Sequence, residues 1–407
     1  MMQNTRLQIA RRCRQLRDIW AAEGHRGISN RIRTAAADRL APKEAVMPVR
    51  PADVVAANLD RRLPGVSPDP PSGGQFVLNW VTTPPSPGSG GHSTLFRIVT
   101  YLEAQGYVNR IYFYDVYRGD HQYYKSIVRQ YYGFHGPIAK VEDGMQDAHA
   151  VIATAWPTAY PVFNDRCAGK RFYFVQDFEP SFHAVGTLSV LAENTYRMGF
   201  HAITAGSWLA QKLSTEFSMD ADHFEFGCDL SRYRRSSTSR RTGVAFYARP
   251  EAARRGFELG LMAIRVFADH RPDIELHLYG DKIGRLPFRF IDHGRVTPDQ
   301  LNDIYNRCYG GLSLSLTNVS LVPLEMLAAG CVPVVNDAPH NRMVLKNPYI
   351  RFAAPTPHAL ASELEALVSM LDFDSLSMAA AASVCSTTWD DAGATVDAVL
   401  RRALQHG

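Results

Sequence analysis

The feature that most constrains the fold is a regular alternation of short apolar runs with longer amphipathic segments, repeated in both halves of the chain. This rhythm is typical of parallel sheets, because parallel neighbours need a crossover helix between them. In the first half we expect strands near Phe76–Val81, Arg110–Tyr114, Ala150–Ala153, Phe172–Gln176, Ala202–Thr204 and Phe224–Phe226. In the second half we expect strands near Val244–Ala248, Ile274–Tyr279, Phe288–Asp292, Gly311–Leu316 and Val332–Asn336. The sequence therefore predicts an α/β protein with two doubly wound, Rossmann-like domains.

The length of 407 residues supports this division, because a single hydrophobic core rarely serves more than about 300 residues. The Pro-rich stretch Leu63–Ser72 suits a linker after an N-terminal helical extension, and the polar, aperiodic segment Ser231–Thr242 suits a linker between the domains. We predict an extension with its linker, two Rossmann-like domains and a terminal helix, over residues 1–72, 73–235, 236–386 and 387–407 respectively.

Positive charge is concentrated at the N-terminus. Residues 1–50 contain eleven Lys and Arg against four acids, while the formal charge of the whole chain is +4. Ile9, Cys13, Leu16 and Trp20 recur at helical spacing among arginines, the pattern of a basic amphipathic helix. Such a helix contacts a membrane surface or packs on its own domain with a solvated arginine face, and the sequence leaves both open. The remainder of the chain is slightly acidic, so we expect no nucleic-acid partner.

Composition excludes several classes of protein. Hydrophobic residues make up 46% and charged residues 21% of the chain, without an unbroken apolar run of about 18 residues, so no membrane span is expected. The six cysteines are widely spaced and form no CxxC pair, which predicts reduced thiols and neither disulfides nor a metal site. The first residues lack the apolar core of a secretory signal, so we expect a cytoplasmic protein.

Loops that follow strands are the places where chemistry is expected, because ligands of open parallel sheets bind at the carboxyl ends of the strands. Gly88, Gly90 and Gly91 follow the first strand and precede a helix. Glycines allow a close approach of the backbone, and the free N–H groups of the helix attract phosphate. The loop matches neither GxGxxG nor a P-loop, so a flexible surface loop remains the alternative to a phosphate contact.

Arginines follow the first strand of the second half. Arg249 lies next to the strand end, and Arg254 and Arg255 precede a long helix. Guanidinium groups in this position can neutralise the charge that develops on a diphosphate leaving group, and they can do so without a metal. The alternative is a solvated basic turn.

A single acid, Glu325, lies in an apolar helix between a polar loop and another apolar strand. An ionised carboxylate in such surroundings is costly unless it has a partner. A ribose diol, which donates two hydroxyl groups, is one such partner, and a nearby arginine is another. The sequence therefore predicts a ribose contact or a structural ion pair for Glu325.

Two further acids, Asp177 and Glu179, emerge at the end of an apolar strand of the first half. Side chains in this position face the second domain, where a carboxylate can orient an acceptor hydroxyl or take its proton. We expect Asp177 in that role. Glu179 is the competing candidate, because Pro180 favours an extended backbone at Glu179.

Together these motifs resemble the family-4 retaining glycosyltransferases of the GT-B fold, from Gly74 to the C-terminus. The resemblance implies two Rossmann-like domains that face each other across a cleft, with a nucleotide-sugar against the second. By motif position, it implies a diphosphate contact for Arg249 and Arg255, beside Gly90 and Gly91, and a ribose contact for Glu325. It also implies that the base is bordered by Gly280, His293, Gly294 and Arg295. The family's segment before the linker is matched by Gly227–Tyr233, and its final helix, which crosses back to the first domain, by Trp389.

A closer resemblance, to the WsaF-like bacterial rhamnosyltransferases, rests on three segments, Gln176–Phe182, Ala205–Leu209 and Ser320–Met326. It implies dTDP-L-rhamnose as the donor. The wider family has a second glutamate upstream of the position of Glu325, and Thr317 stands there in this chain. The usual carboxylate contact to the sugar is therefore missing, and we expect the donor sugar to contact Thr317, Asn318 and Ser320.

The resemblance implies a retaining, metal-independent hexosyltransferase with Asp177, Glu179 and Arg255 as catalytic residues and with no cofactor beyond its nucleotide-sugar substrate. It implies transfer of L-rhamnose to a glycan or lipid-linked acceptor in cell-surface polysaccharide assembly, at the inner face of the membrane if the basic helix docks there. Two alternatives stay open, of which the missing glutamate favours the first. One is a catalytically silent GT-B scaffold that binds a nucleotide-sugar or glycan, and the other is a nucleotide-sugar epimerase on the same fold.

Overall fold

The computed structural model describes residues 2–40, 47–60, 63, 75–236 and 240–405, in two compact units that divide after Pro48. The first unit contains helix α1 (Met2–Leu40), which is interrupted at Gly24 because the backbone there has φ 64° and ψ −156°. Leu16 and Trp20 are exposed on this helix, whereas the side chains of Ile9 and Cys13 lie outside the described part. The predicted Pro-rich linker also lies outside the described residues, apart from Leu63.

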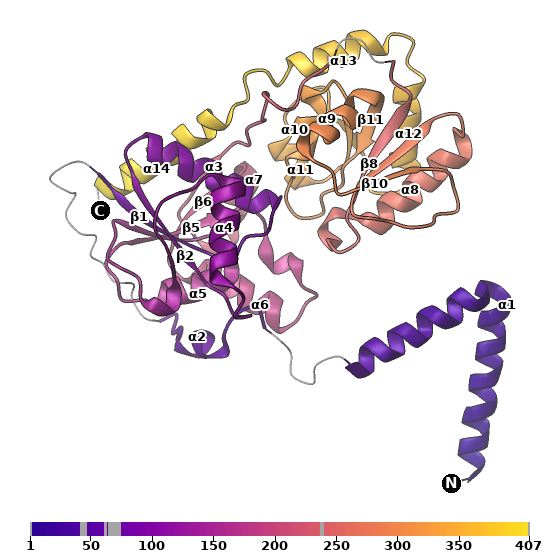
Figure 1. The fold of residues 1–407 in the computed structure, drawn as a ribbon, viewed down its shortest axis with the longest axis horizontal. Helices are drawn as coiled ribbons and strands as arrows, with labels where there is room; N and C mark the ends of the chain where they lie inside the picture. Colours follow the sequence, from indigo (N-terminus) through magenta and orange to yellow (C-terminus); the bar gives the residue numbers. More distant parts are fainter. Residues whose placement is uncertain (1, 41–46, 61–62, 64–74, 237–239, 406–407) are drawn as a thin grey trace. The chain divides into compact units, whose positions relative to one another are not determined.

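The second unit contains two parallel sheets (Figure 1). The first sheet has the order β3-β2-β1-β4-β5-β6-β7. Its strands are β1 (Val77–Thr82), β2 (Val108–Phe113), β3 (Ile138–Lys140), β4 (Ala150–Ala153), β5 (Lys170–Val175), β6 (His201–Ala205) and β7 (Ala221–Phe224). The second sheet has the order β10-β9-β8-β11-β12-β13. Its strands are β8 (Gly243–Ala248), β9 (Glu275–Gly280), β10 (Ile291–Gly294), β11 (Cys308–Leu312), β12 (Val332–Asn336) and β13 (Arg351–Ala353).

The expected strands are present, with two additions and three corrected bounds. The strand expected at Phe224–Phe226 is β7, which ends at Phe224, and the strand expected at Phe288–Asp292 is β10, which begins at Ile291. The edge strands β3 and β13 were not expected from the sequence, because each has three residues and no clear apolar alternation. The strand expected over Gly311–Leu316 ends at Leu312. Beyond this point the N–H of Ser315 donates to the side-chain oxygen of Asn336 at 2.8 Å, so the backbone leaves the sheet.

Helices connect the strands and cover both faces of each sheet. In the first half they are α2 (Pro51–Ala56), α3 (Gly90–Ala104), α4 (His121–Tyr132), α5 (Trp156–Asn164), α6 (Thr187–Asn194) and α7 (Ser207–Phe217). In the second half they are α8 (Phe257–His270), α9 (Pro298–Arg307), α10 (Val322–Ala328), α11 (Pro339–Val344), α12 (Pro357–Val368), α13 (Phe373–Ala382) and α14 (Trp389–Gln405). None of the helices in the described residues is both long and apolar enough to cross a bilayer.

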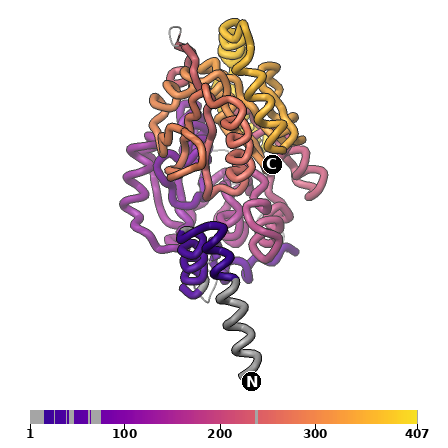
Figure 2. Tube along the Cα trace, turned by 90° about the vertical axis from the view of Figure 1, so that its right-hand side faces the viewer, coloured from indigo at the N-terminus to yellow at the C-terminus, as the bar shows by residue number. Residues whose placement is uncertain are grey.

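The last helix, α14, returns to the first sheet, as the chain coloured from indigo to yellow shows (Figures 1 and 2). It packs on α3 and β7, and its Asp397 accepts a hydrogen bond from the hydroxyl of Tyr107 at 2.7 Å. The chain thus crosses between the halves twice, and the two crossings touch. The N–H of Cys228 donates to the carbonyl oxygen of Thr387 at 3.0 Å, and a Cβ at Gly227 would lie 2.5 Å from the backbone nitrogen of Trp389.

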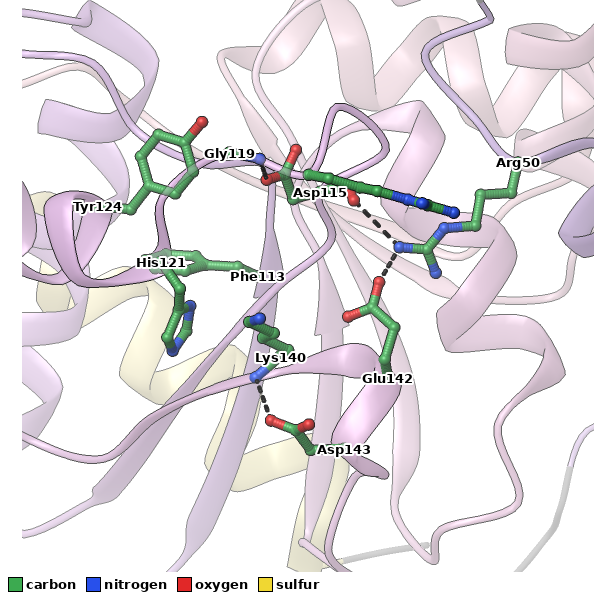
Figure 3. A pocket seen from close by; sticks show the side chains of 10 residues that line it. Arg50, Phe113, Asp115, Gly119, His121, Tyr124, Lys140, Glu142 and Asp143 are labelled. Carbon is green, nitrogen blue, oxygen red and sulfur yellow. Dashed lines mark hydrogen bonds and ion pairs between the residues drawn. The ribbon is translucent and has the colours of Figure 1, made fainter.

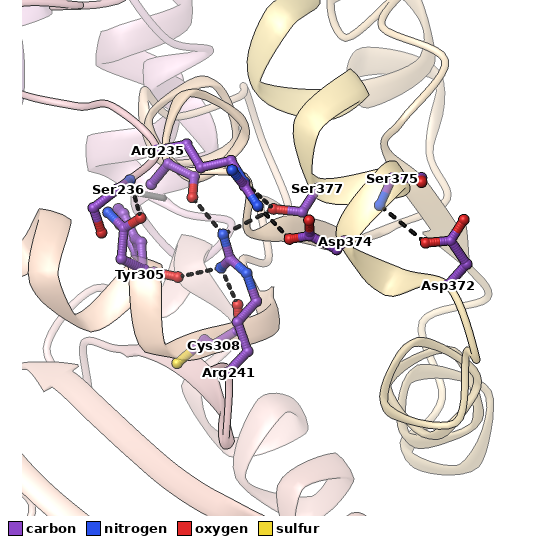
Figure 4. A network of polar contacts seen from close by, with 11 residues as sticks. Arg235, Ser236, Arg241, Tyr305, Cys308, Asp372, Asp374, Ser375 and Ser377 are labelled. Carbon is purple, nitrogen blue, oxygen red and sulfur yellow. Dashed lines mark hydrogen bonds and ion pairs between the residues drawn. The ribbon is translucent and has the colours of Figure 1, made fainter. Parts of the chain in front are cut away.

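A buried arginine fixes α13 to the second sheet (Figure 4). Arg241, 8% exposed, donates to the carbonyl oxygens of Tyr305 at 2.8 Å, Cys308 at 2.5 Å and Ala329 at 2.8 Å, and to the hydroxyl of Ser377 at 2.9 Å. Burial lowers the pKa of Arg241. The cation is retained because its donors are matched to acceptors in the fold.

Candidate functional site

In both sheets the strand order reverses near the middle, because successive strands are added first to one side of the starting strand and then to the other. This switch point lies between β1 and β4 in the first sheet and between β8 and β11 in the second. Ligands of such sheets bind outside the carboxyl ends of the strands at this switch point. The loops beside the second switch point are residues 249–256, after β8, and residues 313–321, after β11. The topology therefore brings together the predicted arginines and the predicted sugar-binding residues.

Arg255 links these two loops. Its Nη1 donates to the hydroxyl of Ser315 at 2.6 Å and to the carbonyl oxygen of Asn318 at 3.0 Å. A backbone hydrogen bond from Leu316 to Arg254, at 2.8 Å, holds the loops together a second time. The guanidinium group of Arg255 is therefore held against the loop after β11.

Positive charge accumulates at this switch point, and a carboxylate from the first sheet faces it. Burial lowers the pKa of Arg255, and the charges of Arg254 and Arg249 act in the same direction. Asp177, which follows β5, has Oδ2 3.4 Å from Nε of Arg254, and that guanidinium lies 4.5 Å from the centre of the Phe182 ring. Burial raises the pKa of Asp177, against the opposing effects of Arg255 and Arg254. The structure thus brings Asp177, Arg254 and Arg255 together.

The loop after β11 adds polar groups in the same place. Nδ2 of Asn318 donates to the carbonyl oxygen of Gln176 at 2.9 Å and to that of the last residue of β6 at 3.0 Å. The Thr317 hydroxyl lies beside Asp177 and lowers the pKa of that carboxyl. The buried hydroxyl of Ser320 has no hydrogen-bond partner among the described residues. An unsatisfied buried hydroxyl is costly, which makes Ser320 a candidate ligand contact.

Glu325 lies in the first turn of α10, close to groups from both halves. Burial raises the pKa of Glu325 to about 7, while Arg97 and the Tyr233 hydroxyl oppose this effect. Arg97, on α3, is itself paired with Asp229 at 3.3 Å and lies 4.7 Å from the centre of the Trp389 ring. In the part of the chain that the structure describes, Glu325 forms no ion pair. Its carboxylate keeps the capacity to accept from a diol.

Arg295, which is predicted to border the nucleobase, and Arg249 both lie next to one carboxylate, Asp281, that the sequence analysis did not identify. Asp281 lies 3.0 Å from Nε of Arg249 and 3.1 Å from Nε of Arg295. This carboxylate aligns the two arginines and offsets part of their charge. Asp281 directly follows β9, so the rule that polar residues at strand ends form sites would have selected it.

The other predicted base-binding residues form the turn beside Asp281. Gly280 has φ 121°, and a Cβ there would lie 2.6 Å from the carbonyl oxygen at the end of β8, so a larger residue does not fit. Gly294, with φ 59°, ends β10. His293 stacks on His277, with the two ring nitrogens 3.0 Å apart, which occupies one edge of the His293 imidazole.

The predicted glycines begin α3 in the first half. A Cβ at Gly90 would meet no atom within 4 Å, so the first turn of this helix faces open space. Ser89 caps the helix by accepting from the N–H of His92 at 3.5 Å. Nε2 of Gln176 donates to the carbonyl oxygen of Gly91 at 3.1 Å, which places the glycines next to the residue that precedes Asp177 in sequence.

The Glu179 side chain does not lie with those of Asp177, Arg254 and Arg255. Its Oε2 accepts from the N–H of Trp156, the first residue of α5, at 2.5 Å, and its own N–H donates to the hydroxyl of Tyr196 at 3.2 Å. The side chain is 5% exposed, and burial raises the pKa of Glu179 to about 8. The structure places this carboxylate at the N-terminus of α5, inside the first half.

Sequence reasoning also missed His340, in α11. Its Nε2 lies 2.7 Å from the carbonyl oxygen of Ser315, and its ring lies 5.3 Å from that of Trp208 across the two halves. Burial lowers the pKa of His340, and the charges of Asp177 and Arg255 both act on it. His340 comes shortly after β12, so the rule applied to the other strand ends would have found it.

Comparisons with known sequences identify two similarities. Residues 242–365 match the family model of the WsaF C-terminal domain. The O-antigen biosynthesis protein RfbC of Myxococcus xanthus is 36% identical over 268 residues, which make up 63% of this chain and 21% of that protein. The chain therefore spans about a fifth of this curated relative.

Solved structures resemble the fold over most of the chain. TarM has a TM-score of 0.66 at 8% identity and covers 83% of this chain and 100% of its own. The pneumococcal O-GlcNAc transferase GtfA, in complex with UDP and GlcNAc, has a TM-score of 0.62 at 9% identity and covers 82% of this chain and 99% of its own. Sucrose-phosphate synthase from Thermosynechococcus elongatus has a TM-score of 0.62 at 10% identity, covering 82% and 100% respectively.

Two parallel sheets of Rossmann order, joined by a linker and by a returning terminal helix, define a protein of the GT-B fold, and the predicted fold class is confirmed. The polar residues of the second half lie on the loops beside its switch point. Residues 242–365 match the model of the WsaF C-terminal domain family, which confirms the resemblance found in the sequence.

Proposed function

We propose that this chain is a glycosyltransferase that moves a sugar from a nucleotide-diphosphate donor to a glycan or lipid-linked acceptor in cell-surface polysaccharide assembly. The observation that carries the proposal is the group of arginines at the second switch point, with Asp177 opposite them. The similarity to an O-antigen biosynthesis protein supports the type of pathway. The UDP in the similar pneumococcal transferase supports a nucleotide donor.

In this proposal the donor lies against the second half. Arg249 and Arg255 hold the diphosphate, and the first turn of α3 at Gly90 and Gly91 offers N–H groups from the other side. Glu325 accepts from the ribose hydroxyls. The nucleobase lies along the turn of Gly280 and along His293, Gly294 and Arg295. Asp281 pairs with both Arg295 and Arg249.

The transfer step follows from the charges. The bond from the anomeric carbon to the diphosphate breaks, the acceptor oxygen forms the new bond, and its proton passes to Asp177 or to the departing diphosphate. The growing negative charge of the leaving group is stabilised by Arg249 and Arg255. Arg254 pairs with Asp177, so a bound diphosphate competes for Arg254 and releases the carboxylate for the acceptor.

The donor sugar in this proposal is L-rhamnose, supplied as dTDP-L-rhamnose and transferred with retention. In this proposal the sugar lies beside Thr317, Asn318 and Ser320. The buried Oδ1 of Asn318 and hydroxyl of Ser320 have no hydrogen-bond partner among the described residues, which supports this assignment. The match to the WsaF C-terminal domain family supports this assignment. A screen of nucleotide-sugars by thermal shift tests it, because a specific ligand stabilises the folded chain by RT ln(1 + [L]/Kd).

A pair of variants tests the roles of the two carboxylates. Asp177→Asn is expected to lower sugar transfer by about 10² to 10⁴-fold, the usual contribution of a general base, with donor affinity retained. Glu179→Gln is expected to keep near-normal turnover, because Glu179 contacts α5. The reverse pattern would transfer the assignment to Glu179.

Donor binding without transfer would favour a scaffold, and release of free nucleotide without an acceptor would favour an epimerase.

We further propose that the basic helix α1 contacts the membrane surface. Leu16 and Trp20 are 48% and 59% exposed on a segment rich in arginine. Apolar side chains among cations bind anionic lipid interfaces. The chain is expected to sediment with vesicles that contain phosphatidylserine, and Trp20→Ser is expected to weaken this binding. Equal binding to neutral vesicles, or no effect of the substitution, would remove the membrane role.

A further inference from the structure

The carboxyl ends of the first sheet offer two places to a ligand. One is a pocket of about 570 Å³ at the ends of β2 and β3 (Figure 3), where cations and carboxylates balance, as the ion pair of Arg50 with Glu142 illustrates. Asp177 and the residues assigned to the donor do not line this pocket. The other place is at the ends of β5 and β6, where Asn318 of the second half reaches the first half.

The amide of Asn318 contacts the ends of both strands. Its Nδ2 donates to the carbonyl oxygen of Gln176, directly after β5, at 2.9 Å and to that of Ala205, the last residue of β6, at 3.0 Å. Because an amide nitrogen carries two hydrogens and carbonyl oxygens can only accept, these bonds use both donors and fix the orientation of the amide. Asn318 is 0% exposed, so water does not compete for these bonds.

The backbone of the same residue holds the arginine assigned to the diphosphate. The carbonyl oxygen of Asn318 accepts from Nη1 of Arg255 at 3.0 Å. The charge of Arg255 also acts on Asp177, where it opposes the rise in pKa that burial causes. Asn318 therefore lies between the cation of the leaving group and the carboxylate proposed as the base.

The bond to Gln176 acts directly on the backbone of Asp177. The Gln176 carbonyl belongs to the peptide bond that joins these two residues, and a peptide unit is planar. Fixing its oxygen therefore fixes the plane that carries the nitrogen and Cα of Asp177. The asparagine side chain has two rotatable bonds, so the connection from one half to the other is short and stiff.

Neighbouring contacts between the halves hold a different segment. The hydroxyl of Ser207 donates to the carbonyl oxygen of Met343 at 3.2 Å, and the Trp208 ring lies 5.3 Å from that of His340. Both contacts fix the start of α7. The side chain of Gln176 turns to the first half, where it donates to Gly91. The peptide before Asp177 thus takes its position relative to the second half from Asn318.

One atom of the amide remains free for a ligand. Oδ1 of Asn318 is buried and has no hydrogen-bond partner within the described part of the chain. This oxygen can only accept, so a hydroxyl group satisfies it. A hydroxyl of the donor sugar in this place would polarise the amide and strengthen both bonds that Nδ2 donates. A bound sugar would then tighten the connection to the first half.

We propose that Asn318 is a positioning residue that sets the place of Asp177 relative to Arg255. The proposal rests on the proposed transferase function and gives a second role to a residue that was assigned there to the donor sugar. The acceptor loses its proton near Asp177 while the bond to the diphosphate breaks near Arg255. Transfer therefore requires the two groups at one fixed separation.

Hydrogen exchange tests the connection in the full chain without a donor. Asn318→Ala is expected to speed amide exchange in residues 176–182, because the peptide before Asp177 loses its contact with the second half. The matched control is Asn306→Ala. Asn306 is also buried, and its Nδ2 donates to the carbonyl oxygens of Arg234 and Asn302, each at 2.9 Å. This control should leave exchange in residues 176–182 unchanged.

A second variant serves if Asn318→Ala does not fold. Asn318→Asp keeps the shape of the side chain and Oδ1 but has no amide hydrogens, so it should also speed exchange in residues 176–182. Exchange in this segment that matches the unchanged chain in the folded variant would overturn the inference, whatever the chain transfers.

A double-mutant cycle tests the consequence for transfer from dTDP-L-rhamnose to a lipid-linked oligosaccharide. Asn318→Ala is expected to lower kcat by about 10²-fold in the unchanged chain. In the Asp177→Asn background the same substitution should lower kcat by less than about twofold, because Asn318 acts through Asp177. Loss of Oδ1 should raise the donor KM in both backgrounds.

The two measurements separate the inference from the proposed function. Equal losses of kcat in both backgrounds would overturn the positioning role, even if the donor KM rises. An unchanged chain that transfers no sugar would contradict the proposed function instead, and hydrogen exchange would still decide whether Asn318 positions the Asp177 backbone.

Discussion

Replacing Glu179 with glutamine is expected to change how the stability of the fold depends on pH. Burial raises the pKa of Glu179 from its ordinary value of 4.5 to about 8. Between these two values the folded chain holds a proton that the unfolded chain releases, so the contribution of this group to stability falls as pH rises. Glutamine can still accept from the N–H of Trp156 but does not titrate.

The size of the effect follows from the difference between the two pKa values. Neutral pH lies about 2.5 units above the pKa of this group in the unfolded chain. Keeping Glu179 protonated in the folded chain at this pH therefore costs about 3 kcal/mol of unfolding free energy. Relative to the glutamine variant, the free energy of unfolding of the unchanged chain should fall by this amount between about pH 4 and pH 7. The loss is large against a typical total stability of about 5–15 kcal/mol.

Urea unfolding at a series of pH values measures this difference directly. Glu325, whose pKa is also raised by burial, contributes equally to both proteins and cancels in the comparison. Glu258→Gln, an exposed glutamate at the start of α8, serves as the control and should follow the unchanged chain. Parallel curves for the unchanged chain and Glu179→Gln would refute the assignment of Glu179 to the interior.

Three further predictions concern the donor site. Glu325→Gln is expected to weaken nucleotide binding by about 1–3 kcal/mol with the fold intact, and unchanged affinity by calorimetry would remove the ribose contact. Transfer is expected to continue in excess EDTA, because arginines neutralise the diphosphate, and an activity that needs added Mg²⁺ or Mn²⁺ would contradict this. Arg255→Lys keeps the charge but loses the planar guanidinium, whose Nη1 donates to Ser315 and Asn318, so kcat should fall more than KM rises; a change in KM alone would argue against leaving-group stabilisation.

The sheets could be predicted from the sequence because central parallel strands are buried on both faces and appear as apolar runs. β4 and β12 have the predicted bounds, and both are fully buried. The short edge strands β3 and β13 lack this pattern and were missed. The grouping of the second-half loops was also predictable, since strand order alone brings the ends of β8 and β11 together.

The partners of the site residues could not be predicted in the same way. The pairing of Asp177 with Arg254 joins side chains of separate sheets, and the sequence pattern does not give the distance between them. Glu179 and Asp177 are two residues apart at one strand end, yet Glu179 turns inward because the first N–H of α5 lies within its reach. Such choices depend on rotamers and on helix ends that only the folded chain brings together.

The contact between the two chain crossings has a mechanical consequence. Because Cys228 is hydrogen-bonded to Thr387 and Gly227 lies against Trp389, the two connections act as one pivot rather than as two independent tethers. A pair of segments pinned at one point resists sliding and favours rotation, so displacement grows with distance from the pivot. The ion pair of Asp177 with Arg254 would then restrain this rotation, and a diphosphate that takes Arg254 would remove the restraint.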